Sequence, residues 1–263
     1  MEIKFSDVCC GYKNTDVLRN LNLRFETGNF YCILGSNGIG KTTLFKTMMG
    51  FLDVKEGRIL IDGKNIGEMS NKEIAHYISY VPQAKNYSYQ YSVLDIVLMG
   101  RAMYIKKFGS PTETDESAAE EALRKLDILH LKDKMYSELS GGEQQIVLIA
   151  RALVQEAQFI VMDEPASNLD YENQKKVLDV LVSLSQNQIG VIMSSHLPDH
   201  VFYCDAKAIL IFKDKSVKEG SCTDVITEEN LSKVYGVRVK VIAHPEDDGS
   251  TIRCCCLSSE QYS

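Results

Sequence analysis

The residues best suited to chemistry form a glycine-rich stretch directly after an apolar run. Tyr31–Leu34 leads into Gly35-Ser36-Asn37-Gly38-Ile39-Gly40-Lys41-Thr42-Thr43, which fits the pattern G-x-x-x-x-G-K-[ST]. Glycines let backbone N–H groups curl around phosphate oxygens, and a following helix directs its positive end at the anion. Lys41 would supply positive charge to the β- and γ-phosphates, and the Thr42 hydroxyl would ligate Mg²⁺. The stretch predicts a nucleoside-triphosphate site.

A second apolar run ends in two carboxylates. Phe159–Met162 is followed by Asp163 and Glu164. Asp163, at the strand end, is placed to hold Mg²⁺ through its waters. Glu164 is placed to polarise an attacking water as general base. Alone, such a run is as often a strand followed by an acidic helix cap, but beside the glycine-rich stretch it predicts hydrolysis of the bound nucleotide.

A third motif lies about a hundred residues after the first, in the sequence Leu139-Ser140-Gly141-Gly142-Glu143-Gln144-Gln145. Ser140 and Glu143 fit a capping box, which by itself only begins a helix. Capping does not require two glycines, however. Glycines here expose backbone N–H groups at the positive end of a helix, so the motif predicts a second phosphate-binding surface.

With these three motifs in order, residues 1–240 resemble the nucleotide-binding subunit of an ABC transporter, because LSGGEQQ is close to the family signature LSGGQ. The resemblance implies a head-to-tail homodimer that binds ATP and Mg²⁺. In it, Ser140 and Gly142 of one copy face the γ-phosphate held by Lys41 of the other. The implied nucleotide contacts are Tyr12, Gly35, Ser36, Asn37, Gly38, Gly40, Lys41, Thr42, Thr43, Ser140, Gly141, Gly142 and Gln144.

The remaining motifs of that family follow in the expected order. Tyr12 matches the aromatic residue that stacks on adenine, and Gln83 matches the glutamine that reaches Mg²⁺ and the attacking water. Ser167–Asp170 matches the loop that crosses the dimer interface, with Asn168 where alanine is commoner and Asp170 also suited to cap a helix. His196 matches the switch histidine at the γ-phosphate. The resemblance thus implies catalytic roles for Glu164, His196, Gln83 and Lys41, and metal ligation by Thr42, Gln83 and Asp163.

The elements that position these residues predict an α/β fold, a P-loop NTPase core with a mixed sheet, an antiparallel β subdomain and an inserted helical signature subdomain. Alternation at Ile3, Phe5 and Val8, and again at Leu21, Leu23 and Phe25, predicts antiparallel strands at the start. Continuous apolar runs predict strands buried on both faces. They are Tyr31–Leu34, Ile78–Val81, Phe159–Met162, Val191–Met193 and Ala208–Phe212.

Helical periodicity dominates the segment between Gln83 and Ala157. We expect helices over Asp115–Leu129, Ser140–Val154 and, after the second carboxylate motif, Tyr171–Ser185. The predicted division is one ABC ATPase domain over 1–240, with its core at 1–83 and 158–240 and the helical subdomain at 84–157. A C-terminal tail, 241–263, follows, and alternation predicts a small hairpin from Val237–Ala243 and Thr251–Leu257.

Bulk properties narrow the class of function. The 263 residues carry a net charge of -7 with a pI near 5.3, which disfavours a nucleic-acid partner. The sequence has no apolar run of membrane-spanning length and lacks the layout of a signal peptide, so we expect a cytoplasmic protein that meets a membrane through a partner. Eight cysteines without CxxC or zinc spacing are expected to be small buried hydrophobic residues.

The kind of transporter is suggested by Tyr91–Arg101, which includes Val93-Leu94-Asp95-Ile96-Val97-Leu98-Met99-Gly100-Arg101. With Phe108-Gly109 and His196-Leu197-Pro198-Asp199-His200, it resembles importers of iron chelates (siderophore or heme) and cobalamin, although Ala102-Met103-Tyr104 replaces their proline–histidine ending. Molybdate-type importers have the same architecture, so an oxyanion is the alternative cargo. The resemblance implies a permease of integral membrane subunits at the cytoplasmic face and, indirectly, a solute-binding protein.

Three other classes fit less well. A soluble ABC ATPase acting on DNA or the ribosome would carry a long coiled coil or a second cassette, and the sequence has neither. An exporter is disfavoured by the segment between Gln83 and Phe108. A GTPase is excluded by LSGGEQQ and by the lack of a guanine-reading NKxD.

The apolar residues Val93, Ile96, Val97 and Met99 are equally consistent with core packing and with a surface that faces the permease.

Overall fold

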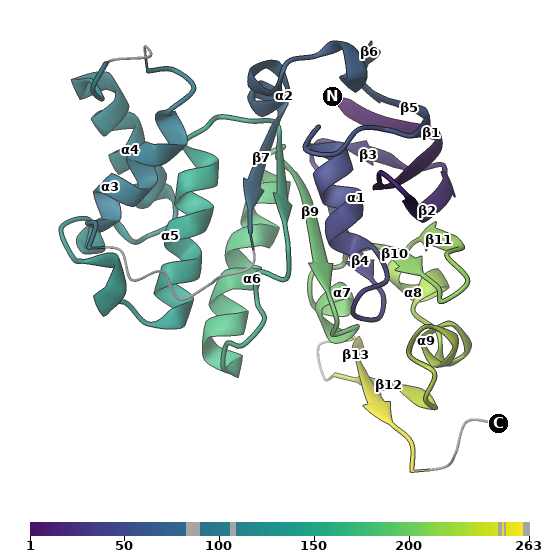
Figure 1. Cartoon of the computed structure of the whole chain (residues 1–263). Coiled ribbons are helices and arrows are strands. Elements are labelled where there is room, and N and C mark those ends of the chain that lie inside the picture. The colour runs from purple at the N-terminus through teal and green to yellow at the C-terminus, as the bar shows by residue number, and fades with distance from the viewer. Residues whose placement is uncertain (83–89, 106–108, 247–248, 250, 260–263) are drawn as a thin grey trace.

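The computed structural model describes residues 1–82, 90–105, 109–246, 249 and 251–259. Figure 1 shows an antiparallel β layer and helix α1 (Lys41–Met48) on one side of a central sheet, and a group of helices on the other side. The C-terminal hairpin projects at one end of the molecule. This is the α/β P-loop NTPase architecture that the sequence predicts.

The central sheet has the strand order β11-β10-β4-β9-β8-β7. Its strands are β4 (Phe30–Leu34), β7 (Ile78–Val81), β8 (Phe159–Met162), β9 (Gly190–Ser195), β10 (Lys207–Ile211) and β11 (Val217–Gly220). All neighbours pair in parallel except β10 and β11. Every residue of β4, β8 and β9 is buried. Helices and a second sheet cover both faces, which is why these strands have continuous apolar sequences.

The antiparallel layer is built around the long first strand. Its strands are β1 (Glu2–Tyr12), β2 (Thr15–Leu21), β3 (Arg24–Glu26), β5 (Glu56–Ile61) and β6 (Lys64–Asn65). β1 pairs with β2, β3 and β5, all antiparallel. The layer and α1 share one buried cluster, to which Phe5, Phe25 and Phe45 belong.

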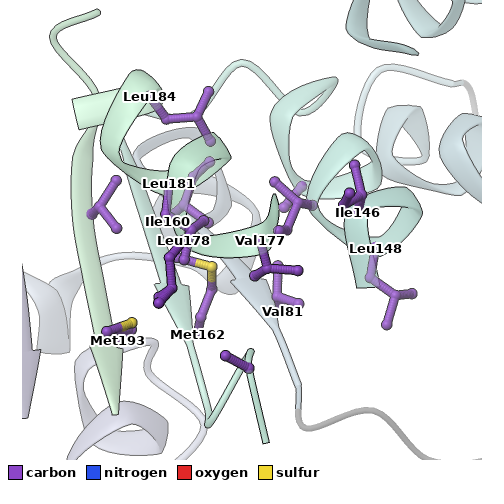
Figure 2. Packing of buried hydrophobic residues seen from close by; sticks show 14 of the residues in the cluster. Val81, Ile146, Leu148, Ile160, Met162, Val177, Leu178, Leu181, Leu184 and Met193 are labelled. Atoms are coloured by element: carbon purple, nitrogen blue, oxygen red, sulfur yellow. The ribbon is translucent and has the colours of Figure 1, made fainter. Parts of the chain in front are cut away.

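Helices lie on the other side of the central sheet. They are α3 (Val93–Leu98), α4 (Glu113–Lys125), α5 (Gly141–Leu153), α6 (Tyr171–Gln186), α7 (Asp199–Tyr203), α8 (Cys222–Val225) and α9 (Glu228–Tyr235), while α2 (Asn71–Tyr77) precedes β7. α5, α6 and α8 contact strands of the sheet, whereas α3 and α4 pack against α5. Figure 2 shows Val177, Leu178 and Leu181 of α6 beside Ile160 and Met162 of β8. No helix in the described ranges is long and apolar enough to cross a membrane.

The helix expected over Asp115–Leu129 is shorter than predicted. α4 ends at Lys125, and Leu129 begins a 3-10 turn, Leu129–Leu131. The reason is local, because Asp127 has a left-handed backbone with φ 58°, and an α-helix does not continue through such a residue. At the other end, Thr112 and Asp115 form a capping box. The described part of 84–157 contains helices and one isolated bridge but no strand, while the domain boundaries stay predictions.

The sequence leaves two roles open for the apolar residues around α3, core packing and a surface that faces the permease. The structure shows residues that fit each role. Val93, Ile96 and Val97 are at most 5% exposed and belong to the core. Met99, in the turn that follows, is 45% exposed. Three of the four residues are therefore explained by packing, and only Met99 remains available for a partner.

The C-terminal hairpin consists of β12 (Val239–Pro245) and β13 (Thr251–Leu257), paired antiparallel from Val239 and Leu257 to Pro245 and Thr251. β12 is shifted by two residues from the expected Val237–Ala243. The expectation that the cysteines are buried holds for Cys9, Cys10, Cys32 and Cys204. It is wrong for Cys254 and Cys256, which are exposed, because alternate residues of β13 point away from the body of the protein.

Candidate active site

The glycine-rich stretch forms the connection between β4 and α1, as the sequence predicts. Gly38 and Gly40 have φ angles of 76° and 127°, which L side chains rarely adopt. A Cβ atom on Gly40 would lie 2.8 Å from Val17 Cγ1, and one on Gly35 would lie 2.9 Å from Ile39 Cγ2. Glycine is therefore favoured by backbone conformation at Gly38, by lack of space at Gly35, and by both at Gly40.

Lys41 is the first residue of α1 and is 5% exposed. Its Nζ atom donates a hydrogen bond of 2.8 Å to the carbonyl of Gly35. The same atom lies 3.7 Å from Glu164 Oε1. The loop backbone and the second carboxylate thus hold the ammonium group at the cavity, where it would meet an anion.

A cavity of about 310 Å³ lies over the loop. Its lining consists of Asn37, Gly38, Ile39, Gly40, Lys41, Thr42, Thr43, Asp163 and Glu164. The two groups of residues that the sequence places at the nucleotide, one after β4 and one after β8, therefore meet in one cavity. Ser36 lies in the same loop without lining the cavity, and its carbonyl accepts a hydrogen bond from the Ile39 N–H.

The oxygen atoms of Thr42 and Asp163 fit a magnesium ion. Thr42 Oγ1 donates a hydrogen bond of 2.6 Å to Asp163 Oδ2, and both residues line the cavity. Hydroxyl and carboxylate oxygens are the ligands that Mg²⁺ prefers, and it is usually held by one or two such groups together with phosphate oxygens. Gln83, the third predicted metal ligand, lies outside the described residues.

Glu164 lies between a lysine and a histidine. Lys41 Nζ is 3.7 Å from one carboxylate oxygen, and His196 Nδ1 is 3.5 Å from the other. Glu164 has a φ of 50°, a left-handed conformation that costs energy for a residue with a Cβ and is concentrated at functional sites. The structure thus brings together Lys41, Thr42, Asp163, Glu164 and His196.

Ser194 joins the two carboxylate residues and has no role in the predictions from sequence. Its Oγ atom donates a hydrogen bond of 2.6 Å to Asp163 Oδ1 and accepts one of 3.0 Å from the Glu164 N–H. Ser194 is fully buried near the end of β9. A polar residue near the carboxyl end of an apolar parallel strand is the signal that could have identified it, as it identified Asp163.

A second missed residue is Lys215, in the turn between β10 and β11. Its Nζ atom donates a hydrogen bond of 2.9 Å to the carbonyl of Ile39. This hydrogen bond holds the backbone of the glycine-rich loop at Ile39. Nothing in the sequence around Lys215 predicts the contact.

The signature motif begins α5 as predicted. Ser140 Oγ accepts a hydrogen bond from the Glu143 N–H, and Glu143 Oε2 accepts from the Ser140 N–H at 2.8 Å. The Ser140 hydroxyl also donates to Glu143 Oε2, at 2.8 Å. The two bonds that the Ser140 N–H and hydroxyl donate to this carboxylate lower the pKa of Glu143. Within one chain, Ser140, Gly141, Gly142 and Gln144 do not line the cavity over the glycine-rich loop. The Gln144 amide donates to the Tyr136 carbonyl at 3.0 Å.

Gly142 is required by packing within its own chain. A Cβ atom there would lie 2.2 Å from Asn173 Oδ1, on the first turn of α6. A Cβ on Gly141 would meet only Leu169 Cδ2, at 3.2 Å. The sequence interpretation assigned both glycines to phosphate binding, whereas the structure gives Gly142 an additional steric reason.

The loop Ser167–Asp170 connects the carboxylates to α6. Ser167 N–H and Oγ both donate to the Glu164 carbonyl, at 3.1 and 2.9 Å. Asn168 has a φ of 61°, which asparagine tolerates better than alanine does. Asp170 caps α6, as expected, by accepting a hydrogen bond of 2.9 Å from the Asn173 N–H.

Tyr12, the predicted adenine-stacking residue, is 49% exposed at the end of β1. It pairs with Thr15 across the turn into β2. Val17, two residues further along β2, contacts the glycine-rich loop at Gly40. The structure therefore places Tyr12 on the hairpin that adjoins the loop, although it does not line the cavity itself.

Comparisons with known proteins agree with this geometry. The family model described as ABC transporter matches residues 18–167. A molybdate import ATP-binding protein of Haemophilus influenzae is 36% identical over 83% of this chain and 81% of its own length. A probable iron chelatin transport ATP-binding protein of Helicobacter pylori is 32% identical over 94% and 97%.

Among solved structures, the chain is similar to a putative metal-chelate type ABC transporter in an inward-facing conformation. The TM-score is 0.87 at 30% identity, over 98% of both chains. The family model therefore matches more than half of the chain. The same chain has a cavity in which the two nucleotide motifs meet, and it has the signature motif at the start of α5. The protein belongs to the ABC transporter family, as an ATP-binding subunit with ATPase activity.

Proposed function

We propose that the chain drives import of a metal chelate, of iron-siderophore, heme or cobalamin type, through a separate permease at the cytoplasmic face of the membrane. Two copies would bind two MgATP and couple closure and hydrolysis to transport. The observation that carries the proposal is the likeness to the metal-chelate type transporter over 98% of the chain. It includes the C-terminal part that the family model does not reach.

The positions of the described site residues support the following roles. Lys41 and the N–H groups of the glycine-rich loop would bind the β- and γ-phosphates, and Thr42 and Asp163 would hold Mg²⁺, which would neutralise phosphate charge. Gln83 is given a share in holding Mg²⁺ by the sequence resemblance alone, because it lies outside the described residues. Glu164 orients a water for attack and accepts its proton. His196, whose Nδ1 is 3.5 Å from Glu164 Oε2, contacts the γ-phosphate. Positioning and electrostatic stabilisation of this kind supply most of the rate in phosphoryl transfer.

The site is proposed to be complete only in a dimer. Ser140 and Gly141 are exposed at the start of α5, Gly142 is buried there, and none of the three lines the cavity of its own chain. In a head-to-tail pair, Ser140 and Gly142 of one copy would contact the γ-phosphate held by Lys41 of the other. For Ser140 to do so, its hydroxyl would exchange its present bond of 2.8 Å to Glu143 Oε2 for one to a phosphate oxygen.

The permease is proposed to dock at a groove that lies between the end of α1, helix α2 and the predicted helical subdomain, residues 84–157. The groove has a volume of about 340 Å³, and its lining includes Phe51, Ile74, Tyr80, Met99 and Arg151. Phe51 and Met99 are 60% and 45% exposed. Two large exposed apolar side chains at one groove are typical of a protein contact.

Substitution of Phe51 by Asp tests this contact. The variant should lose co-purification with its membrane partner and keep its basal ATPase rate, because Phe51 does not line the ATP cavity. Leu257→Asp, 76% exposed on β13, is the matched control and should co-purify normally. Normal co-purification of the Phe51 variant would contradict the assignment of the groove.

The second candidate cargo is molybdate or tungstate. The favouring observation is the 36% identity to the molybdate import protein, against 32% to the iron chelatin protein. Reconstitution of the complex with its permease and solute-binding protein in liposomes discriminates the two. Stimulation of ATP hydrolysis by iron chelates, heme or cobalamin supports the first proposal, and stimulation only by molybdate or tungstate replaces it with the second.

A further inference from the structure

His196 lies in a short connection, residues 196–198, between β9 and α7. Its side chain is 46% exposed, so side-chain packing holds it only in part. The distance from His196 Nδ1 to Glu164 Oε2, 3.5 Å, therefore depends on how the backbone of this connection is held. Two of the contacts that hold it come from the C-terminal part of the chain.

The first contact is a hydrogen bond of 3.2 Å from the Tyr235 hydroxyl to the His196 carbonyl. Tyr235 is the last residue of α9, which ends at Gly236 in a left-handed conformation. Burial raises the pKa of Tyr235, so the phenol keeps its proton and remains a donor. The bond acts on the backbone of the histidine itself and leaves the imidazole free for the γ-phosphate.

The second contact is a hydrogen bond of 2.8 Å from the Cys255 N–H to Asp199 Oδ1. It joins β13 to the start of α7, three residues after His196. The hairpin is in turn held to α9, because the Val239 N–H donates to Ser232 Oγ at 3.0 Å and the Val241 N–H to Glu228 Oε1 at 3.1 Å. α9, the hairpin and the His196 connection thus form one closed set of contacts.

We propose that Tyr235 and Asp199 are positioning residues for His196, through which the C-terminal helix and hairpin set the rate of ATP hydrolysis. The inference rests on the role proposed above for His196 at the γ-phosphate. It gives the hairpin a part in the reaction, although no described residue of β12 or β13 lines the ATP cavity.

Removal of a single oxygen atom tests the first contact. Tyr235→Phe should lower kcat by about three- to tenfold, the factor expected for one lost hydrogen bond, and should change KM for ATP by less than about twofold. Tyr203→Phe is the matched control, since its hydroxyl donates to Asp179 at 2.6 Å on the surface of α7. It should keep the kcat of the parent protein.

The second contact is tested by a pair of substitutions at one position. Asp199→Ala removes the acceptor and should lower kcat, whereas Asp199→Asn keeps an oxygen that can accept from the Cys255 N–H and should restore most of the rate. Equal losses in both variants would overturn the positioning role of Asp199. Thermal unfolding of all variants separates a loss of rate from a loss of folded protein.

A double-mutant cycle shows whether Tyr235 acts through His196. On a His196→Ala background, Tyr235→Phe should change the residual rate by less than about twofold, because no imidazole remains to be positioned. The same loss on both backgrounds, or a normal kcat in Tyr235→Phe alone, would overturn the inference while leaving the role of His196 intact. A parent-like rate in His196→Ala would overturn both.

Discussion

The hydroxyl of Ser194 donates a hydrogen bond of 2.6 Å to Asp163, so a side chain of β9 fixes the carboxylate that follows β8. The same oxygen accepts from the Glu164 N–H. One buried hydroxyl therefore sets the orientation of the proposed metal ligand and the backbone of the proposed general base. Neither contact involves the nucleotide directly, which is why the motifs of the nucleotide site do not include this residue.

Ser194→Ala should lower kcat about tenfold, because Asp163 and the Glu164 N–H each lose a buried partner. The same loss should reduce the free energy of unfolding by about 1–3 kcal/mol. ATPase assays and urea unfolding measure the two effects. Ser79→Ala is the control, since its buried hydroxyl on β7 donates to the Phe159 carbonyl at 3.3 Å. It should lower stability without lowering kcat, and an unchanged kcat in Ser194→Ala would contradict the role assigned to Ser194.

Glu164→Gln should slow hydrolysis by at least about a hundredfold, because the amide accepts a proton far less readily than the carboxylate. ATP binding should persist, so the variant should accumulate as an ATP-bound dimer. Size-exclusion chromatography with and without MgATP measures the dimer. Glu172→Gln, which loses only a surface pair with Lys176, should turn over normally. A Glu164 variant that hydrolyses rapidly or stays monomeric in MgATP would show that the assigned role is wrong.

Lys41→Ala should reduce ATP affinity or turnover to a background level, because it removes the buried cation next to the glycine-rich loop. Calorimetric titration with ATP, followed by an ATPase assay, measures both quantities. Lys46→Ala, on the same helix but outside the cavity lining, should bind ATP normally. Full activity in Lys41→Ala would invalidate the site as a whole.

His200 predicts a pH dependence of stability. Burial lowers its pKa from 6.5 to about 4, and its Nδ1 lies 3.0 Å from Ser195 Oγ. Between these values the unfolded chain binds a proton that the folded protein does not. The free energy of unfolding should therefore fall as the pH is lowered from 6.5 towards 4, by up to about 3 kcal/mol, and the contribution should be complete above pH 6.5.

Urea unfolding at several pH values, compared between the parent and His200→Gln, isolates this contribution. The parent should lose more stability than the variant between pH 7 and pH 5. His244→Gln, at an exposed position of the hairpin, should follow the parent. Parallel curves for the parent and His200→Gln would exclude His200 as the source of the effect.

Much of the fold could be predicted because its signals are local. Ile78–Val81 and Phe159–Met162 are strands with the predicted bounds, since strands buried on both faces need continuous apolar sequences. The capping box at Ser140 fixed the start of α5. The end of α4 was wrong because a left-handed Asp127 is not distinguished from a helical aspartate by periodicity.

The parts of the site that escaped prediction depend on contacts between distant segments. Ser194 meets Asp163 across 31 residues and Lys215 meets Ile39 across 176. The polar end of an apolar strand marks Ser194 as a candidate without naming its partner, and nothing in the sequence around Lys215 indicates its contact. The exposure of Met99 beside the buried Val97 likewise depends on where the helical layer ends, which hydrophobic spacing does not reveal.

The alternation along β8 has a consequence for movement during turnover. Phe159 and Val161 lie in the cluster shared with α1, whereas Ile160 and Met162 lie in the cluster under α6. A strand packed tightly on both faces cannot shift without opening a cavity in one of them. Asp163 and Glu164, which follow directly, therefore keep a constant position relative to both layers. We therefore expect the conformational changes of the transport cycle to move other parts of the protein as rigid bodies relative to β8. The positions of Asp163 and Glu164 at the nucleotide would then be preserved.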